Sequence, residues 1–185
     1  MKPEKMDKTR FFISMGIPAT PQIKEAQRKL REIPGISVPG EVHLTLRFIG
    51  EADDKKINSL KKRMQSLEDF PSFKVSMKGM GAFPNIKEPR VVWIGADMGD
   101  PFYKILSSLE KMLDDSSLDY DDKPFKAHVT LGRVKSPSSK LTSLITENRD
   151  LEAGSFVCNN ICLMGSELRP TGAVHSLIAS YVLKD

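Results

Sequence analysis

The sequence lacks long apolar runs, blocks of basic residues and more than two cysteines. Its apolar runs are too short to cross a bilayer. No apolar stretch follows the charged residues of MKPEKMDKTRFF, so we expect no signal peptide, no membrane partner and a cytoplasmic protein. Cys158 and Cys162 have no histidine nearby, which leaves too few ligands for a metal site. Four residues apart on one strand, over 155–164, they are expected to be reduced, unbridged thiols.

The composition is that of an ordinary globular protein. The chain has 185 residues, of which 39% are hydrophobic and 28% charged, and no low-complexity linker divides it. We therefore expect a single domain over 1–185, built from two closely packed lobes, and a monomer. The net charge of +4 is compatible with an anionic partner, but any nucleic-acid contact would be a local patch.

The hydrophobic pattern predicts alternating strands and helices, which indicates an α+β architecture with helices covering sheet faces. The expected strands are 10–16, 43–50, 73–80, 90–96, 127–134, 155–164 and 174–183. Helices are expected after Thr20-Pro21, Asp53, Asp100-Pro101 and Ser136-Pro137, where a capping residue precedes an apolar periodic stretch.

Two of these strands share a motif. EVHLTLRFIG at 41–50 and KAHVTLGRVK at 126–135 both contain histidine, an apolar residue, threonine and leucine. Residues two apart on a strand point to the same side, so His43 should lie beside Thr45 and His128 beside Thr130. A single such pair is common and carries little meaning. Two copies in matching frames, in a chain with three histidines, indicate one shared site.

The residue types suit phosphodiester cleavage. Imidazole titrates near neutrality, so one histidine can accept a proton from the attacking oxygen while the other donates one to the leaving oxygen. A threonine hydroxyl beside each ring can donate to the non-bridging phosphate oxygens, where negative charge is held.

The motifs resemble those of the 2H phosphoesterase superfamily, and the chain looks most like its RNA 2′,3′-cyclic phosphodiesterase group, also called the LigT-like or 2′-5′ RNA ligase family. The likeness extends over nearly the whole chain. RFFISMGIP resembles the opening strand, GAFP and PRVVWIG the middle segment, and GSELRPTGAVHSLI the closing hairpin. The resemblance implies a bilobal α+β fold: two pseudo-symmetric lobes of antiparallel sheet with outer helices and a central cleft.

The resemblance also implies an activity, the hydrolysis of RNA 2′,3′-cyclic phosphate ends to 2′-phosphates, with no metal and no cofactor. Its substrate would be RNA ending in such a group, with tRNA fragments as one source. In the family pattern His43 is the proton donor and His128 the proton acceptor. Thr45 and Thr130 hold phosphate-binding positions, and Arg133 matches a family arginine. His175 departs from the pattern, which commonly has tyrosine there, and stands either for a third catalytic histidine or for a replacement of that aromatic.

Four more residues on or beside the motif strands are candidates for contact with RNA: Arg10, Phe12, Arg47 and Lys126. The three basic side chains could form a positive rim, and Phe12 could stack on a base. Arg47 shares a face with His43 only in an unbroken strand, since a bulge would turn it away.

Three other functions compete with cyclic phosphate hydrolysis. The same histidines could run the reverse transesterification, 2′-5′ RNA ligation, with a 5′-hydroxyl in place of water. A non-catalytic protein that binds RNA ends would need the site but not both histidines. A metal-dependent phosphoesterase is disfavoured, because no acidic residue shares the histidine face of either motif strand.

Overall fold

The computed structural model describes residues 9–170 and 172–185. Most of the N-terminal stretch for which we expected no signal peptide lies outside the described residues, as does Thr171. The elements are β1 (Arg10–Gly16), α1 (Pro21–Arg31), β2 (Ile36–Ser37), β3 (His43–Glu51), α2 (Asp54–Met64), a 3-10 helix (Gln65–Asp69), β4 (Phe73–Phe83), β5 (Val91–Asp97), α3 (Gly99–Asp115), β6 (His128–Val134), α4 (Ser139–Glu147), β7 (Glu152–Cys158), β8 (Asn160–Arg169) and β9 (Gly172–Val182).

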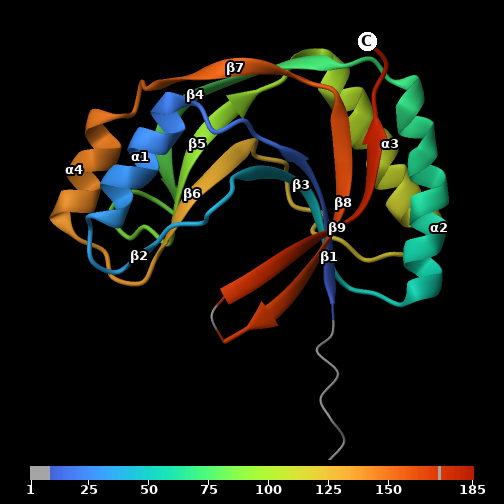
Figure 1. The fold of residues 1–185 in the computed structure, drawn as a ribbon, viewed down its shortest axis with the longest axis horizontal. Coiled ribbons are helices and arrows are strands. Elements are labelled where there is room, and N and C mark those ends of the chain that lie inside the picture. Colours follow the sequence, from blue (N-terminus) through green and yellow to red (C-terminus); the bar gives the residue numbers. More distant parts are fainter. Residues whose placement is uncertain (1–8, 171) are drawn as a thin grey trace, which may run out of the picture.

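The strands form two antiparallel sheets, one in each lobe (Figure 1). The first sheet has the order β3-β1-β8-β9, and the second has the order β2-β6-β5-β4-β7. Helices α2 and α3 lie on the outer side of the first sheet, while α1 and α4 lie on the outer side of the second (Figure 1). This is the expected α+β fold of two lobes with outer helices.

The first two helices begin where the sequence predicts. Thr20 accepts a hydrogen bond from the backbone N–H of Ile23 at 3.3 Å, and Pro21 occupies the first turn of α1. Asp53 accepts from the backbone N–H of Lys56 at 2.9 Å and so caps α2. Each cap satisfies a donor that the helix itself leaves unpaired.

The other two helix starts differ from the prediction by two residues each. Helix α3 already begins at Gly99, whose N–H donates to the Asp97 carboxylate at 3.3 Å, so Asp100 lies inside its first turn. Helix α4 is capped by Ser138, whose hydroxyl accepts from a backbone N–H at 3.2 Å. Ser136 and Pro137 therefore precede the cap. The helix starts after Ser138 because the Ser138 hydroxyl accepts a hydrogen bond from a backbone N–H of the first turn.

The strand predicted over 155–164 is two strands. The ladder stops at Asn159, and the chain passes from β7 in the second sheet to β8 in the first. Cys158 and Cys162 therefore lie on different strands, and both are free thiols. Burial raises the pKa of the Cys158 thiol to about 11, which keeps it protonated near neutral pH.

Each sheet packs one face against its helices. On the motif strands this face carries Leu44, Leu46, Val129 and Leu131, all buried in the core. We call the opposite face of each sheet, which its helices do not cover, the inner face.

Within the described ranges, no helix combines the length and apolar character needed to cross a membrane.

Candidate active site

The two motifs lie on neighbouring strands of different sheets. Strand β3 is an edge of the first sheet, and it runs beside β6 of the second with Cα atoms within 8 Å. His43 is paired with Gly16 and Thr45 with Ser14, so histidine and threonine share the inner face of β3. The alternation of buried aliphatic residues and half-buried His128 and Thr130 gives the same arrangement on β6.

Both motif strands carry a bulge immediately after the shared threonine. In β3 the register jumps from Ser14–Thr45 to Ile13–Arg47, which leaves Leu46 without a partner. In β6 it jumps from Trp93–Thr130 to Val92–Gly132, which leaves Leu131 without one. An extra residue reverses which side the following residues face. Consequently the residue five positions after each histidine returns to the inner face.

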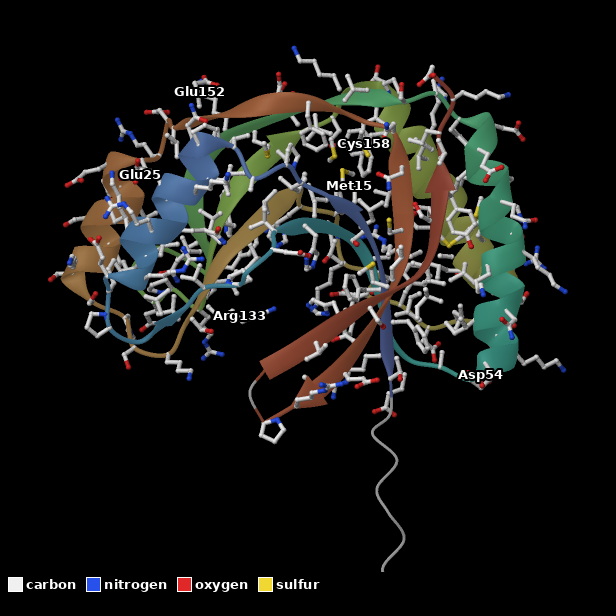
Figure 2. The ribbon with its side chains drawn as sticks, viewed as in Figure 1. Met15, Glu25, Asp54, Arg133, Glu152 and Cys158 are labelled. Carbon is white, nitrogen blue, oxygen red and sulfur yellow. The ribbon has the colours of Figure 1, made fainter. Side chains whose placement is uncertain are left out.

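Those residues are Phe48 and Arg133. Phe48 pairs with Phe12, and its side chain is 44% exposed. Arg133 pairs with Val91 and is also exposed; Figure 2 shows it between the two lobes. The structure thus brings Arg133 to the motif face, which simple alternation from Thr130 would not do. Phe48 was missed by sequence reasoning, although its place relative to His43 is that of Arg133 relative to His128.

The same bulge turns Arg47 away from the site. Arg47 pairs across the ladder with the fully buried Ile13, and it is only 8% exposed. Its Nε donates to the carboxylate of Glu110 on α3 at 3.0 Å, and its guanidinium lies over the ring of Phe125 at 5.7 Å. The expectation that Arg47 forms part of an RNA-binding rim is therefore wrong, because a bulge interrupts the strand.

Aromatic rings surround His43. Its ring centroid is 5.3 Å from that of Phe12 on β1 and 5.4 Å from that of His175 on β9. Phe12 and His175 also contact each other, at 5.1 Å. Phe12 faces inward as predicted, but it is 3% exposed and packed between two imidazoles. It therefore supports His43 and is not available to stack on a base.

Burial and nearby charges disfavour the protonated form of His43. Burial lowers the pKa of His43 most, and the nearby His175 and Arg133 lower it further, while Glu41 acts in the opposite direction. Arg133, exposed on the inner face of β6, is thus near enough for its positive charge to act on the His43 ring. The free protein thus holds His43 neutral at neutral pH.

His128 is held by a hydrogen bond of its own. Its Nδ1 lies 2.6 Å from the carbonyl oxygen of Lys126. Because a carbonyl oxygen only accepts, Nδ1 must carry the proton, and Nε2 of the neutral ring is left with its lone pair. The ring also packs edge-on against Phe83, at a centroid distance of 4.9 Å.

Phe83 and Trp93 form a wall next to His128. Their ring centroids are 5.1 Å apart, and the indole covers Gly81, where an added Cβ would approach it to 2.3 Å. Only glycine leaves room for this ring. The indole N–H is buried and has no hydrogen-bond partner among the described residues.

The remaining candidates lie at the edges of this site. Arg10 starts β1 on the same side as Phe12 and is half-buried. The ammonium of Lys126 lies 5.8 Å from the centroid of Phe83, beside His128.

In the part of the chain that the structure describes, no three His, Cys, Asp or Glu side chains gather in an arrangement that could hold a metal ion.

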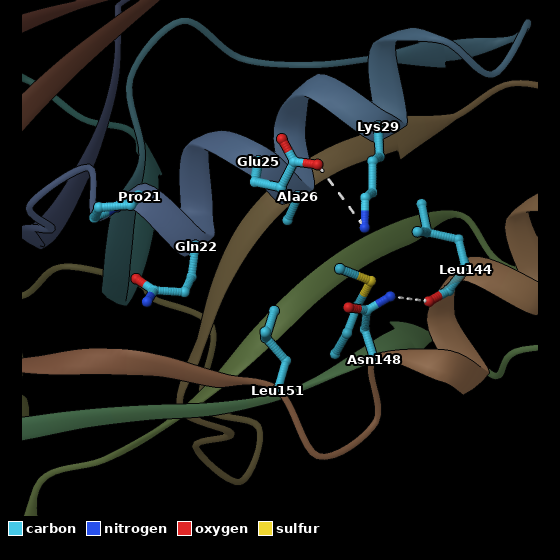
Figure 3. A pocket seen from close by; sticks show the side chains of 9 residues that line it. Pro21, Gln22, Glu25, Ala26, Lys29, Leu144, Asn148 and Leu151 are labelled. Atoms are coloured by element: carbon cyan, nitrogen blue, oxygen red, sulfur yellow. Dashed lines mark hydrogen bonds and ion pairs between the residues drawn. The ribbon is translucent and has the colours of Figure 1, made fainter.

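A surface hollow of ≈ 270 Å³ lies elsewhere, between α1 and α4 (Figure 3). Its floor includes Met80, Leu144 and Leu151, and none of the candidate site residues lines it. Its charged groups, Glu25 and Lys29, form an exposed ion pair at 3.9 Å. The hollow thus offers no acid/base pair, and we place the candidate active site at the inner faces of β3 and β6.

Comparisons with known proteins identify the family of the chain. The model of the family described as LigT like Phosphoesterase matches residues 16–93 and 96–175, which include both motifs. The chain is 30% identical over 171 residues to a protein of Archaeoglobus fulgidus named RNA 2′,3′-cyclic phosphodiesterase, covering 90% of this chain and 96% of that protein. A protein of the same name from Methanocaldococcus jannaschii is 30% identical over 180 residues, covering 93% and 99%.

Solved structures show the same fold. The protein TT0787 of Thermus thermophilus superimposes with a TM-score of 0.81 at 27% identity, covering 95% of this chain and 98% of that one. The apo form of Escherichia coli LigT gives a TM-score of 0.71 at 19% identity, covering 97% and 99%. The resemblance seen in the two histidine motifs is confirmed, and the chain belongs to the LigT-like family of 2H phosphoesterases.

Proposed function

We propose that this protein hydrolyses RNA 2′,3′-cyclic phosphate ends to 2′-phosphates, with His43 as proton donor and His128 as proton acceptor. The relatives that match most of the chain carry the name of this activity. The observation that carries the proposal is the pairing of two histidine–threonine motifs on adjacent strands of different sheets, with the exposed Arg133 on the same face of β6. Such a site can surround one phosphate with two imidazoles, two hydroxyls and a guanidinium.

The hydrogen bond at His128 supports its role as proton acceptor. With Nδ1–H donated to the Lys126 carbonyl, Nε2 can take a proton from a water molecule. The water oxygen forms a bond to phosphorus, and the bond from phosphorus to the ribose 3′-oxygen breaks. The positive charge that develops on the His128 ring is stabilised by the same carbonyl oxygen.

His43 then supplies the other proton. Arg133 and His175 oppose its protonation in the free protein, whereas an anionic phosphate between these groups would favour it. The substrate therefore brings His43 into its protonated form, and His43 gives that proton to the departing 3′-oxygen. Thr45 and Thr130 donate hydrogen bonds to the non-bridging oxygens while charge develops there.

Contacts with the rest of the RNA would come from the flanks of the inner faces. Phe48 is the exposed aromatic residue that the bulge places on this surface, and its ring suits stacking on a base. Arg10 and Lys126 stand at the edges with their positive charges. A tRNA fragment with a cyclic phosphate end is one substrate that such a surface would accept.

The direct test uses the purified protein, EDTA and an RNA oligonucleotide that ends in a 2′,3′-cyclic phosphate. We expect opening to the 2′-phosphate, with a bell-shaped dependence of kcat/KM on pH because one group must be protonated and the other not. Chromatography of the product against 2′- and 3′-phosphate standards measures the outcome. Activity lost in EDTA and restored by zinc or manganese would refute the metal-free mechanism, and tight binding without opening would indicate a binding protein.

A second experiment concerns Arg133. We expect Arg133→Ala to lower kcat/KM by about 10–100-fold, because an exposed guanidinium that binds phosphate is lost. Arg133→Lys is the matched control, since it keeps the charge but loses the two-pronged geometry, and it should fall between wild type and Ala. Steady-state rates on the same oligonucleotide measure both. Wild-type kcat/KM in Arg133→Ala would remove this residue from the site.

A further inference from the structure

His175 reaches His43 from a distant strand. In the order β3-β1-β8-β9 two strands separate β9 from β3, and strands in a sheet lie about 4.8 Å apart, so a flat sheet would keep these side chains well separated. The centroids of the two imidazoles are nevertheless 5.4 Å apart. The sheet must therefore be strongly curved. In Figure 1 strands β8 and β9 extend together past β1, toward the side of the second lobe.

The two motif histidines are held in different ways. His128 donates to a backbone carbonyl, whereas neither imidazole nitrogen of His43 has a hydrogen-bond partner among the described residues. His43 is fixed by rings instead: Phe12 packs on it with an interplanar angle of 31°, and His175 meets it edge-on at 87°. A proton donor must keep its orientation toward the leaving oxygen, so these contacts matter for its function.

The charges around this cluster come from several elements. His43 contacts His175 on β9, and the charges of Arg133 on β6 and Glu41 in the segment before β3 act on its ring. His175 faces Arg133, and Arg10 on β1 stands in the same row, because Arg10 pairs with Ser166 and Ser166 with His175. Apart from Glu41, the charged and titratable groups near the two rings are cations or become cations when protonated.

We propose that His175 is a positioning residue for His43, which fixes the orientation of its ring and couples its protonation to the anion in the site. Burial and Arg133 lower the pKa of His175, as burial, His175 and Arg133 lower that of His43. Two imidazoles in contact titrate as a coupled pair, in which the first proton taken up discourages the second. A bound phosphate anion offsets the repulsion between the two protonated rings, so the histidine pair takes up protons when phosphate binds.

This inference deepens the proposed function, since it concerns the proton donor of that reaction, and its test does not require activity. The chain has only three histidines, so their imidazole signals can be followed by NMR and assigned from single variants. We would titrate wild type, His175→Phe and His175→Gln between about pH 4 and 9, with and without inorganic phosphate. His175→Phe keeps a ring against Phe12 and His43 but cannot be protonated, whereas His175→Gln removes the ring as well.

We expect the His43 midpoint in His175→Phe to rise, because the opposing charge of His175 is gone. Phosphate should raise the His43 midpoint in wild type by more than in His175→Phe. In the hydrolysis assay, the limb of the pH profile that depends on His43 should move to higher pH by the same amount. For a proton donor, which must be protonated, this is the alkaline limb.

The loss of the ring in His175→Gln should lower kcat beyond any change in pH dependence, because His43 then keeps only its contact with Phe12 and is held less firmly. An unchanged His43 midpoint in His175→Phe would overturn the proposal, whether or not the protein hydrolyses the oligonucleotide. Conversely, a shifted midpoint in a protein without hydrolytic activity would refute the proposed function and keep the coupling of the two histidines.

Discussion

Replacing His43 or His128 with alanine is expected to lower kcat/KM on cyclic phosphate RNA by about 10²–10⁴-fold, which is the contribution of a general acid or base. The two residues act in one proton-transfer sequence, so the double variant should lose little more than the worse single variant. Rates at matched pH, measured with the oligonucleotide assay, give both comparisons. Losses that multiply in the double variant would show that the histidines work independently.

Lys29→Ala is a suitable control for this series. Lys29 lies on α1 in the outer hollow, and its ion pair with Glu25 is exposed, so neither rate nor fold should change. Far-ultraviolet circular dichroism and thermal unfolding would confirm that the histidine variants remain folded. A histidine variant that is folded and fully active would remove that residue from the mechanism.

Replacing Arg47 with alanine is expected to lower the free energy of unfolding by about 2–3 kcal/mol and to leave the catalytic rate of the folded protein unchanged. The variant deprives the Glu110 carboxylate of its partner and removes a stacked guanidinium from Phe125. Glu110 is 32% exposed, so water recovers part of the loss, and we expect less than for a fully buried pair. Urea unfolding followed by circular dichroism measures the change.

Arg133→Ala is the reciprocal control for Arg47. Both arginines follow a motif histidine, but Arg133 is exposed and should change stability by no more than about 0.5 kcal/mol while it lowers activity. Removing Glu110 together with Arg47 should restore part of the stability, since no unpaired carboxylate remains. If Arg47→Ala instead kept its stability and lost its activity, our assignment of Arg47 to the outer side of β3 would be wrong.

The sequence predicts those features that depend on local pattern. Alternation identifies both motif strands, and capping residues identify the starts of α1 and α2. Bulges are not visible in this pattern, because the aliphatic residue that bulges is the same leucine that alternation assigns to the core. For this reason the sequence places Arg47 on the inner face only if the strand is unbroken, and Phe48 was overlooked.

Other differences arise from tertiary contacts. The apolar run around Asn159 looks continuous, yet its two halves complete different sheets, and only the packing of the lobes requires that break. The contact between His175 and His43 depends on the curvature of a four-stranded sheet, which no short segment encodes. The motif residues could thus be identified from the sequence, but the side chains that lie next to them in the folded protein could not.

The bulge repeated in β3 and β6 has a consequence for how a strand of RNA would be oriented. A site with two equivalent halves would accept a substrate equally well in either direction, whereas a nucleic acid has a 5′ and a 3′ end. At the two equivalent positions the chain has a hydrocarbon ring, Phe48, and a permanent cation, Arg133. Under the proposed function, Phe48 and Arg133 make the two halves of the site different. This difference determines the direction in which the RNA strand lies across the site.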